Sequence, residues 1–531
     1  MSKKSRAKKA KIPAAKRPLP AKISTPKGVA DQPAPKKYIL LSLFILIFLP
    51  AFTFWPVLGH EFLNWDDPQN ITGNPQIKSF AAQNLKAIFL DSAKISGYYI
   101  PLTFLTFSAD HALFGLDARA FHRTSLILHI ANGLLVFWLF YLLTRRLSWA
   151  FLSAAFFSVH PLQVEPVSWL TERKGLLAAF FLLGSLLFYL RFSRPSPLPS
   201  PPPWGARGRT KGKIWSYLGA MTFFILSLLS KPTGLTLPFL LLLLDYYHGR
   251  RWHSRVFYEK APFFALSMIF GLVSLVGQEA RGAMGSREVL SLNNLLWAPH
   301  SILFYLAIFF FPVNLSAFYP YPDHVPFASI FLASGLIAAI IYFRKQRECL
   351  FGTGFFFLAI LPVIKVIPFG NYIAADRLIY IPSIGLCFLI GWLCHRLGAA
   401  SAKIARSKIP SFFLMAAGIV GIFVWLSRER VPVWHDSGTL WEDVLKHHSK
   451  VALAHANLGA FYGEKNRLDE AILQLQKALA LQPNYARAHY NLAVAYLRKN
   501  ESSLAMQHFA RALSLGHKFS PEIMKELESG K

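Results

Sequence analysis

Two adjacent carboxylates follow the first long apolar segment of the chain, in the sequence Asn64-Trp65-Asp66-Asp67-Pro68. Paired acids just beyond an apolar segment suit a general base with an orienting partner, and they also suit a divalent metal site. Asp-Asp-Pro is equally an ordinary turn sequence, so a solvated turn stays open as the plainer interpretation. Asp66 and Asp67 are therefore the first candidates for chemistry.

A second polar group begins where the apolar run 149–159 ends. His160 and Glu165 should emerge there at a membrane surface, beside the loop that carries the acid pair. Arg173 and Lys174 then open the next apolar run, and paired cations at the level of the lipid headgroups can hold a phosphate. The competing interpretation is a snorkelling pair that only anchors its helix at the interface.

A third polar group contains Asp376, Arg377 and Tyr380. Arg377 stands at the start of an apolar run on the side that the other basic clusters avoid, against the positive-inside rule. An anionic lipid phosphate would explain this position. Lys231, at a tight turn between two apolar runs, is a further candidate, although a turn lysine that reaches the interface explains it as well.

The elements that position these residues must be membrane helices, because the chain is both apolar and basic. Of its 531 residues, 53% are hydrophobic and only 16% are charged, yet the net charge is +30. This composition excludes an ordinary soluble enzyme, and it favours membrane embedding over nucleic-acid binding. The three cysteines fall in or beside apolar runs and indicate neither a disulfide framework nor a zinc site.

The apolar runs predict an all-α, polytopic membrane protein. Residues 1–37 contain 12 Lys and Arg and one acid, which predicts a disordered basic cytosolic tail. Residues 38–428 then form a multi-spanning domain of about 11 transmembrane helices, with the segment 293–311 taken as re-entrant or interfacial. Basic clusters between the runs mark the cytosolic side. The three polar groups, and the chain after residue 428, are then expected on the opposite side.

Residues 429–531 are more polar and nearly balanced in charge. Small and aromatic residues recur there with a period of about 34 residues, which is typical of tetratricopeptide (TPR) repeats and predicts an α-solenoid with repeats at about 452–485 and 486–519. Trp441 indicates a capping helix at 438–450. Two repeats are few for such an array, so a small packing module and a peptide-binding groove both stay open.

Four motifs follow one another along the chain: Asn64-Trp65-Asp66-Asp67, Tyr99-Ile100-Pro101-Leu102-Thr103, His160-Pro161 with Glu165-Pro166-Val167-Ser168-Trp169, and Asp376-Arg377-Leu378-Ile379-Tyr380-Ile381-Pro382-Ser383. Together with the TPR region, their order resembles the TMTC family. These are transmembrane and TPR-containing protein O-mannosyltransferases of the GT-C glycosyltransferase superfamily, and the resemblance extends to their bacterial relatives. The TPR array is shorter than in the animal members.

The resemblance implies an enzyme that moves a sugar, mannose in this family, from a polyprenyl-phosphate carrier to a Ser or Thr hydroxyl of a protein on the non-cytosolic face. It implies that Asp66 or Asp67 is the catalytic base and that the lipid phosphate is bound by three cations, Arg173, Lys174 and Arg377. Acceptor-binding or orienting roles fall to His160, Glu165, Asp376 and Tyr380. No cofactor is certain, and a divalent metal held by His160 and Glu165 stays open.

The expected partners are thus the polyprenyl-phosphate-linked donor, a polypeptide acceptor, membrane lipids and a protein bound by the TPR repeats, with no nucleic acid. The basic tail and the short TPR array favour a bacterial inner membrane, with the active site and the TPR domain in the periplasm. Two alternatives remain. One is a GT-C glycosyltransferase that acts on an envelope glycan or lipid, and the other is a non-catalytic membrane scaffold that displays TPR repeats.

Overall fold

The computed structural model describes residues 34–193, 203–280, 292–322, 324, 328–343, 345–364, 372–405 and 411–517. The tail predicted at 1–37 lies outside these residues except at its last positions. The described chain is almost wholly helical, with one antiparallel pair of short strands, β1 (Tyr319–Pro320) and β2 (Tyr372–Ala374). This confirms the prediction of an all-α fold.

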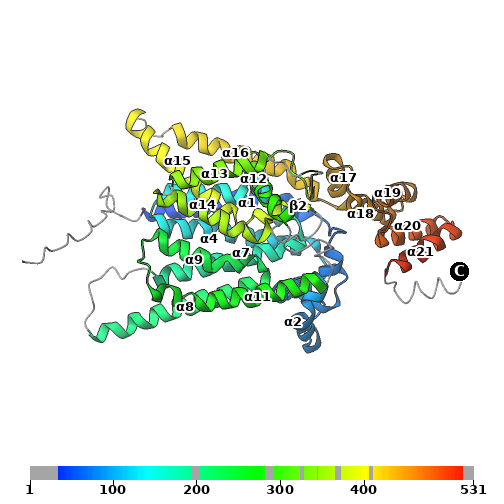
Figure 1. Cartoon of the computed structure of the whole chain (residues 1–531), viewed down its shortest axis with the longest axis horizontal. Coiled ribbons are helices and arrows are strands. Elements are labelled where there is room, and N and C mark those ends of the chain that lie inside the picture. The colour runs from blue at the N-terminus through cyan, green and yellow to red at the C-terminus, as the bar shows by residue number, and fades with distance from the viewer. Residues whose placement is uncertain are drawn as a thin grey trace, which may run out of the picture.

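The helices of the amino-terminal four fifths form one bundle (Figure 1). Its longer helices are α1 (Lys36–Phe54), α2 (Ala82–Ser96), α3 (Pro101–Phe114), α4 (Ala118–Thr144), α5 (Leu147–Val159), α7 (Arg173–Ser193), α8 (Pro203–Ser230), α9 (Leu237–Tyr247), α11 (Ala261–Ala280), α12 (Leu292–Phe310), α13 (Ala328–Phe343), α14 (Arg347–Ile360), α15 (Ser383–Ala405) and α16 (Ser411–Arg430). Short helical turns join them: η1 (Trp55–Gly59), η2 (Pro68–Thr72), η3 (Pro75–Ile77), η4 (Pro161–Gln163), α6 (Val164–Ser168), η5 (Leu170–Glu172), η6 (Pro232–Thr236), α10 (Ser254–Tyr258), η7 (Leu361–Val363), η8 (Asp376–Ile379) and η9 (Val431–Trp434).

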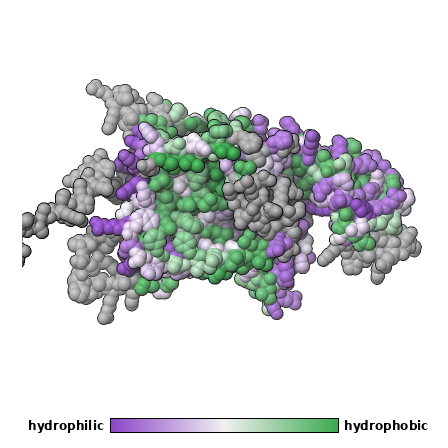
Figure 2. All heavy atoms as spheres, in the orientation of Figure 1, coloured by the Kyte–Doolittle hydropathy of each residue, from purple (hydrophilic) through white to green (hydrophobic). Residues whose placement is uncertain are grey.

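Several of these helices are long and apolar enough to cross a membrane, so the chain is a multi-pass membrane protein. Within the described residues, five helices meet this test, and a sixth span results if α5 and the bent segment Pro161–Ser168 count as one. Shorter apolar helices include Leu296–Phe310 and Ser383–Gly398. Figure 2 shows an apolar band across the bundle with hydrophilic residues at both ends. The count of about eleven crossings stays a prediction.

The segment 293–311 forms one helix, α12, that continues through Pro299. A proline normally kinks or ends a helix, but Pro299 lies inside α12. Its described apolar part is shorter than the five spanning helices. Its re-entrant or interfacial path stays a prediction.

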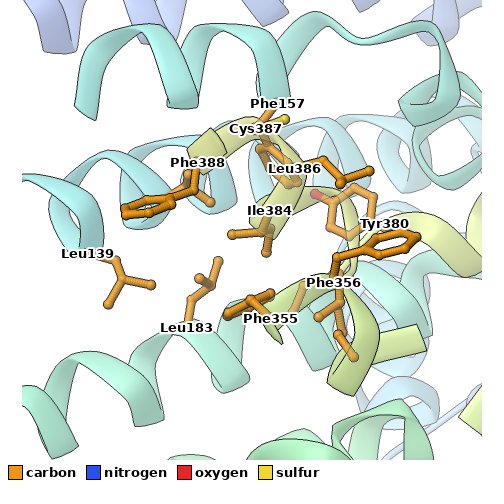
Figure 3. Close-up of a cluster of buried hydrophobic side chains, with 14 of the residues drawn as sticks. Leu139, Phe157, Leu183, Phe355, Phe356, Tyr380, Ile384, Leu386, Cys387 and Phe388 are labelled. Atoms are coloured by element: carbon orange, nitrogen blue, oxygen red, sulfur yellow. The ribbon is translucent and has the colours of Figure 1, made fainter. Parts of the chain in front are cut away.

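The core of the bundle lies where α4, α5, α7, α14 and α15 meet. Figure 3 shows side chains from these helices pointing toward one another, among them Leu139, Phe157 and Ile384. Close approach of α14 and α15 depends on glycine, because a Cβ at Gly385 would lie 2.5 Å from the carbonyl oxygen of Gly352. Such small residues let membrane helices pack through direct van der Waals contact.

The carboxy-terminal helices are arranged as stacked pairs. They are α17 (Ser437–His447), α18 (Ala452–Glu464), α19 (Leu468–Leu481), α20 (Ala486–Arg498) and α21 (Ser502–Ser514). Gly459 allows α18 to approach α19, because a Cβ there would meet the side chain of Leu475 at 2.7 Å. This confirms the predicted TPR solenoid.

The TPR helices extend from the end of the bundle opposite to the end where α1 begins (Figure 1). At the α1 end, the backbone amide of Ala34 donates to the hydroxyl of Tyr141, close to the end of α4. Lys36, Lys37, Arg145 and Arg146 therefore gather at one end of the bundle, and the TPR helices lie at the other.

Candidate active site

A pocket of about 430 Å³ lies at the TPR end of the bundle. Its polar lining residues are Asp66, Ser96, Glu172, Lys174, Lys231, Gln278, Arg377 and Gln482. Its remaining lining is aromatic or aliphatic: Trp65, Tyr98, Trp169, Phe318, Tyr372, Leu378, Leu453 and Tyr485. The three polar groups of the sequence thus each contribute to one pocket, through Asp66, Lys174 and Arg377.

The adjacent acids Asp66 and Asp67 have different surroundings. Asp67 is fully buried, and its carboxylate accepts hydrogen bonds from the Leu63 amide at 2.9 Å and from the Thr171 hydroxyl at 2.6 Å and amide at 3.2 Å. Asp66 is half-buried and lines the pocket. Within the described chain, no hydrogen bond or ion pair engages the Asp66 carboxylate. Asp67 therefore fixes the loop, and Asp66 is the member of the pair that lines the pocket.

Burial raises the pKa of Asp67 to about 6, although its hydrogen bonds from Thr171 and Leu63 oppose this shift. The negative charge of Asp66 raises it further. The backbone carbonyl of Asp66 accepts from both the amide and the side-chain nitrogen of Asn70, at 3.1 and 2.9 Å. Hydrogen bonds to the Asp67 carboxylate and to the Asp66 carbonyl thus fix the backbone of the turn around Asp66.

Arg377 forms the opposite wall of the pocket. Its Nη1 donates to the buried carboxylate of Glu165 at 2.5 Å, and its backbone amide donates to the other carboxylate oxygen at 2.8 Å. The guanidinium lies 5.3 Å from the Trp65 ring and 5.1 Å from the Trp169 ring, which stack on each other at 4.4 Å. Glu165 therefore positions Arg377 and does not itself line the pocket.

Two lysines complete the cationic side of the pocket. Lys231, at the start of η6, pairs with Glu172 of η5. Lys174 is buried, and its Nζ lies 5.8 Å from the centres of both the Tyr98 and Trp169 rings. No carboxylate in the described part of the chain forms an ion pair with Lys174. Lys174 is thus the pocket cation whose charge is not balanced by a fixed partner.

Arg173 does not reach this pocket, although it precedes Lys174 in sequence. Its side chain is fully buried, pairs with Asp110 of α3 at 2.6 Å and donates to the backbone carbonyl of Phe121 at 2.7 Å. The guanidinium also packs on the rings of Phe107 and Phe121. Successive residues of a helix point about 100° apart, so Arg173 faces α3 and α4 while Lys174 faces the pocket.

Three further residues suggested by the sequence lie away from the pocket. His160 is buried against Phe309, lies 2.9 Å from that residue's carbonyl oxygen through Nε2, and accepts from the Leu162 amide. The Tyr380 hydroxyl lies 2.8 Å from His129 Nδ1, within the core drawn in Figure 3. Asp376 accepts from the Tyr319 hydroxyl at 2.9 Å. All three fix the local structure around the site.

A second pocket, of about 420 Å³, adjoins the first. The two share Tyr98, Lys231, Gln278, Tyr372 and Leu378. The rest of its lining is mostly apolar and comes from η6, α9, α11 and η7, including Leu235, Phe239, Leu275, Leu361 and Val363. A charged pocket and a mostly apolar pocket thus lie side by side and share part of their walls.

Spacing along the sequence does not indicate several of the lining residues. Tyr98, Gln278, Leu453, Gln482 and Tyr485 come from distant segments and carry no local motif. Glu172 and Lys231 can be singled out from the sequence because they are charged residues beside apolar runs. The sequence does not predict that they form an ion pair. Among the described residues, no group of three or more His, Cys, Asp and Glu is arranged to hold a metal ion.

Comparison with known proteins gives matches to both parts of the chain. Family models described as TPR repeat and tetratricopeptide repeat match residues 459–500 and 486–515. The chain is 23% identical over 482 residues to the protein O-mannosyl-transferase F38B6.6 of Caenorhabditis elegans, covering 84% of this chain and 63% of that protein. It is 22% identical over 446 residues to human protein O-mannosyl-transferase TMTC1, covering 73% of this chain and 48% of that protein.

Human protein O-mannosyl-transferase TMTC4 is 26% identical over 433 residues, covering 70% of this chain and 56% of that protein. Among solved structures, ArnT from Cupriavidus metallidurans bound to undecaprenyl phosphate aligns with a TM-score of 0.35 and 12% identity over 80% of each chain. The expected resemblance to TMTC proteins is thus confirmed. The chain spans 63%, 48% and 56% of the three O-mannosyl-transferases.

Proposed function

We propose that this chain, which is similar along most of its length to protein O-mannosyl-transferases, is a membrane glycosyltransferase. Its donor would be a polyprenyl-phosphate-linked sugar, with mannose expected, and its acceptor a Ser or Thr hydroxyl of a polypeptide. One observation carries the proposal. A carboxylate without a fixed partner among the described residues, Asp66, shares a pocket with Lys174, Lys231 and Arg377, and that pocket adjoins an apolar one.

The two adjoining pockets match the two parts of such a donor. A polyprenyl phosphate ester of a sugar carries one negative charge on its phosphodiester. Lys174 supplies one cation without a fixed carboxylate, and Lys231 and Arg377 can share their hydrogen-bond donors with a phosphate. The neighbouring apolar lining suits the first isoprene units. Lys231 lines both pockets and so marks where the phosphate and the chain would meet.

Asp66 is the residue that would carry the proton. Its carboxylate takes the proton of the acceptor hydroxyl while the hydroxyl oxygen forms a bond to the anomeric carbon. The bond between that carbon and the phosphate oxygen breaks, and polyprenyl phosphate leaves with the bonding electrons. Lys174, Lys231 and Arg377 stabilise the negative charge that develops on the leaving phosphate. This chemistry needs no residue from outside the pocket.

The pocket is expected on the non-cytosolic side of the membrane. It lies at the TPR end of the bundle, whereas Lys36, Lys37, Arg145 and Arg146 gather at the other end. The positive-inside rule assigns that basic end to the cytosol. In a bacterial inner membrane the pocket and the TPR helices would then face the periplasm.

An envelope glycan or lipid is the second candidate acceptor. The observation that favours it is the small number of TPR repeats, because two repeats offer little surface for a protein ligand. A non-catalytic scaffold has less support, since it gives no reason for Asp66 and three cations to share a pocket.

Transfer by the purified full chain in liposomes tests the proposal. The protein would be given polyprenyl-phosphate mannose, or the same carrier loaded with glucose, together with a Ser/Thr-rich peptide. We expect mannose on the peptide and free polyprenyl phosphate in equal amounts. Transfer only to an added envelope glycan or lipid would support the second candidate. Failure to consume either donor with any of these acceptors would contradict the proposal.

A further inference from the structure

The TPR helices form part of the pocket wall. Leu453 of α18, Gln482 from the turn between α19 and α20, and Tyr485 just before α20 all line it. The apolar pocket beside it has no TPR residue in its lining. This TPR wall therefore belongs to the charged pocket and not to the apolar one.

Asn64 joins this wall to the loop that carries Asp66. Its amide donates to the Ser437 hydroxyl at 2.9 Å, and its side-chain nitrogen donates to the Asn457 carbonyl at 2.9 Å. The indole of Trp441 donates to the side-chain oxygen of Asn64 at 2.8 Å. The carbonyl of Asn64 accepts from Arg487 at 3.3 Å.

These contacts reach α17, α18 and α20 from a single buried residue two positions before Asp66. Trp65 extends the junction, because its ring meets the Trp441 ring edge-on at 5.0 Å while it stacks on Trp169. A domain tethered only to recruit a distant partner would not need such contacts. The TPR helices are thus fixed against the candidate base.

We propose that the TPR wall is the acceptor subsite of this enzyme, with Gln482 and Leu453 in contact with an extended polypeptide segment that presents its hydroxyl to Asp66. The inference rests on the proposed function. The cations and the apolar pocket suit the donor, which leaves the TPR wall for the acceptor. Asp66 lines the same pocket as the cations and the TPR wall, as a base that serves both substrates must.

The chemistry of the wall suits a peptide backbone. Gln482 is exposed in the turn between the two repeats, and its amide offers both a donor and an acceptor. Leu453 and Tyr485 add apolar contact in the same pocket. A volume of about 430 Å³ falls within the range of roughly 300–1,000 Å³ for small-ligand sites, so a sugar and a side chain fit but a folded domain does not.

Kinetics with the full chain test this assignment. Gln482→Ala and Leu453→Ala should each raise the KM for the acceptor peptide, by about tenfold for a contact worth about 1.4 kcal/mol. The KM for the polyprenyl-phosphate sugar should not change. Gln507→Ala is the matched control, an exposed glutamine on α21 away from the pocket, and its acceptor KM should equal that of the unaltered protein.

A binding readout separates the subsite from turnover. A benzophenone attached to Gln482→Cys should cross-link to the peptide, and excess unmodified peptide should compete; the same group on Gln507→Cys should not cross-link. Unchanged acceptor KM in both alanine variants, a rise in donor KM alone, or no cross-link at Gln482→Cys would overturn the subsite while the enzyme stays active. If the unaltered protein consumes no donor, the proposed function fails and the subsite with it.

Discussion

Residues that are adjacent in the sequence have different positions in the candidate site. Asp66 lines the pocket. Its neighbour Asp67 is buried, and its carboxylate accepts three hydrogen bonds. Arg173 and Lys174 are adjacent too, and only the lysine reaches the pocket. In both pairs one member holds the framework and the other faces the space where substrates would bind.

Asp67→Asn should destabilise the protein and spare the chemistry. The amide group of asparagine would place a donor opposite the Leu63 amide, so one buried hydrogen bond is lost, at about 1–3 kcal/mol. Thermal unfolding in detergent would measure the loss. Sugar transfer by the variant below its melting temperature should stay within a few-fold of normal. A loss of transfer without any loss of stability would contradict this division of roles.

The pH dependence of that loss follows from the raised pKa of Asp67. The folded protein keeps the Asp67 proton up to about pH 6, whereas the unfolded chain releases it near pH 3.8. The stability due to this proton is fully present below pH 3.8 and is lost as pH rises through 6. The destabilisation caused by Asp67→Asn should therefore be larger at pH 5 than at pH 7. An equal or reversed difference would argue against a raised pKa.

Lys174→Gln should weaken donor binding. A charge-assisted hydrogen bond to the phosphate is worth about 1.5–3 kcal/mol, so the donor KM should rise by roughly ten- to a hundredfold. Lys174→Arg keeps the charge and should recover part of the loss. Lys94→Gln removes a largely exposed lysine on α2 and serves as the control. A donor KM that is normal in Lys174→Gln would remove this lysine from the phosphate site.

Charged residues beside apolar runs could be predicted as functional from the sequence, but the residues that they contact could not. The sequence indicates that Asp66, Lys174 and Arg377 belong near one another. It does not separate Asp66 from Asp67, because that difference depends on Thr171, which lies 104 residues away in sequence. Tyr98 and Gln278 carry no signal at all, since they reach the pocket only through the packing of α11 against η6 and against the end of α2, where Gln278 donates to the Gly97 carbonyl.

At the scale of elements, buried ion pairs fix the helices around the pocket. Asp110 of α3 holds Arg173 at the start of α7, and Glu165 of α6 holds Arg377 of η8. Charges buried in this way are costly unless paired. The family resemblance implies a phosphate-binding role for Arg173, but its position indicates a role in joining helices.

Arg173→Gln should therefore act on stability. Removing one partner of a buried pair leaves Asp110 uncompensated and should cost about 3–5 kcal/mol of the free energy of unfolding. The double variant Asp110→Asn with Arg173→Gln should lose less than Arg173→Gln alone. Thermal unfolding of the three proteins in detergent would compare them. A normal melting temperature together with a raised donor KM would instead place Arg173 at the phosphate.

The elements themselves were well indicated by hydrophobic patterning. Apolar runs predict most helices of the bundle, and the small and aromatic positions of the carboxy-terminal region predict the TPR helix pairs. Patterning does not predict that α12 continues through Pro299, because a proline inside a helix removes a backbone donor and normally kinks or ends the helix. It also gives no hint that α18 and α20 lie against the loop before Asp66.

The whole molecule is polarised along the axis of the bundle. One end carries the basic residues around Lys36 and Arg145, and the other carries the pocket and the TPR helices. Net charge alone, at +30, does not distinguish a membrane protein from a nucleic-acid-binding protein. Its position along the chain does, because the basic clusters alternate with apolar runs.

Labelling of single cysteines tests this orientation. In a Cys349→Ser background, Gln507→Cys on α21 should react with a membrane-impermeant maleimide in intact cells stripped of their outer membrane. Arg146→Cys, at the opposite end, should react only after lysis. The two remaining cysteines are buried. Labelling of Arg146→Cys in intact cells, with Gln507→Cys protected, would reverse the orientation and place the pocket in the cytosol.

The most direct test of the account is the rate of mannose transfer by Asp66→Asn. The purified variant would be compared with Asp91→Asn, which removes another acid, on α2, that already pairs with Lys94. Loss of a general base costs about 10²–10⁴-fold in rate. We predict a loss of this size in Asp66→Asn at an unchanged melting temperature, and normal transfer by Asp91→Asn. Transfer by Asp66→Asn at the normal rate would contradict the central claim that this pocket is the site of sugar transfer.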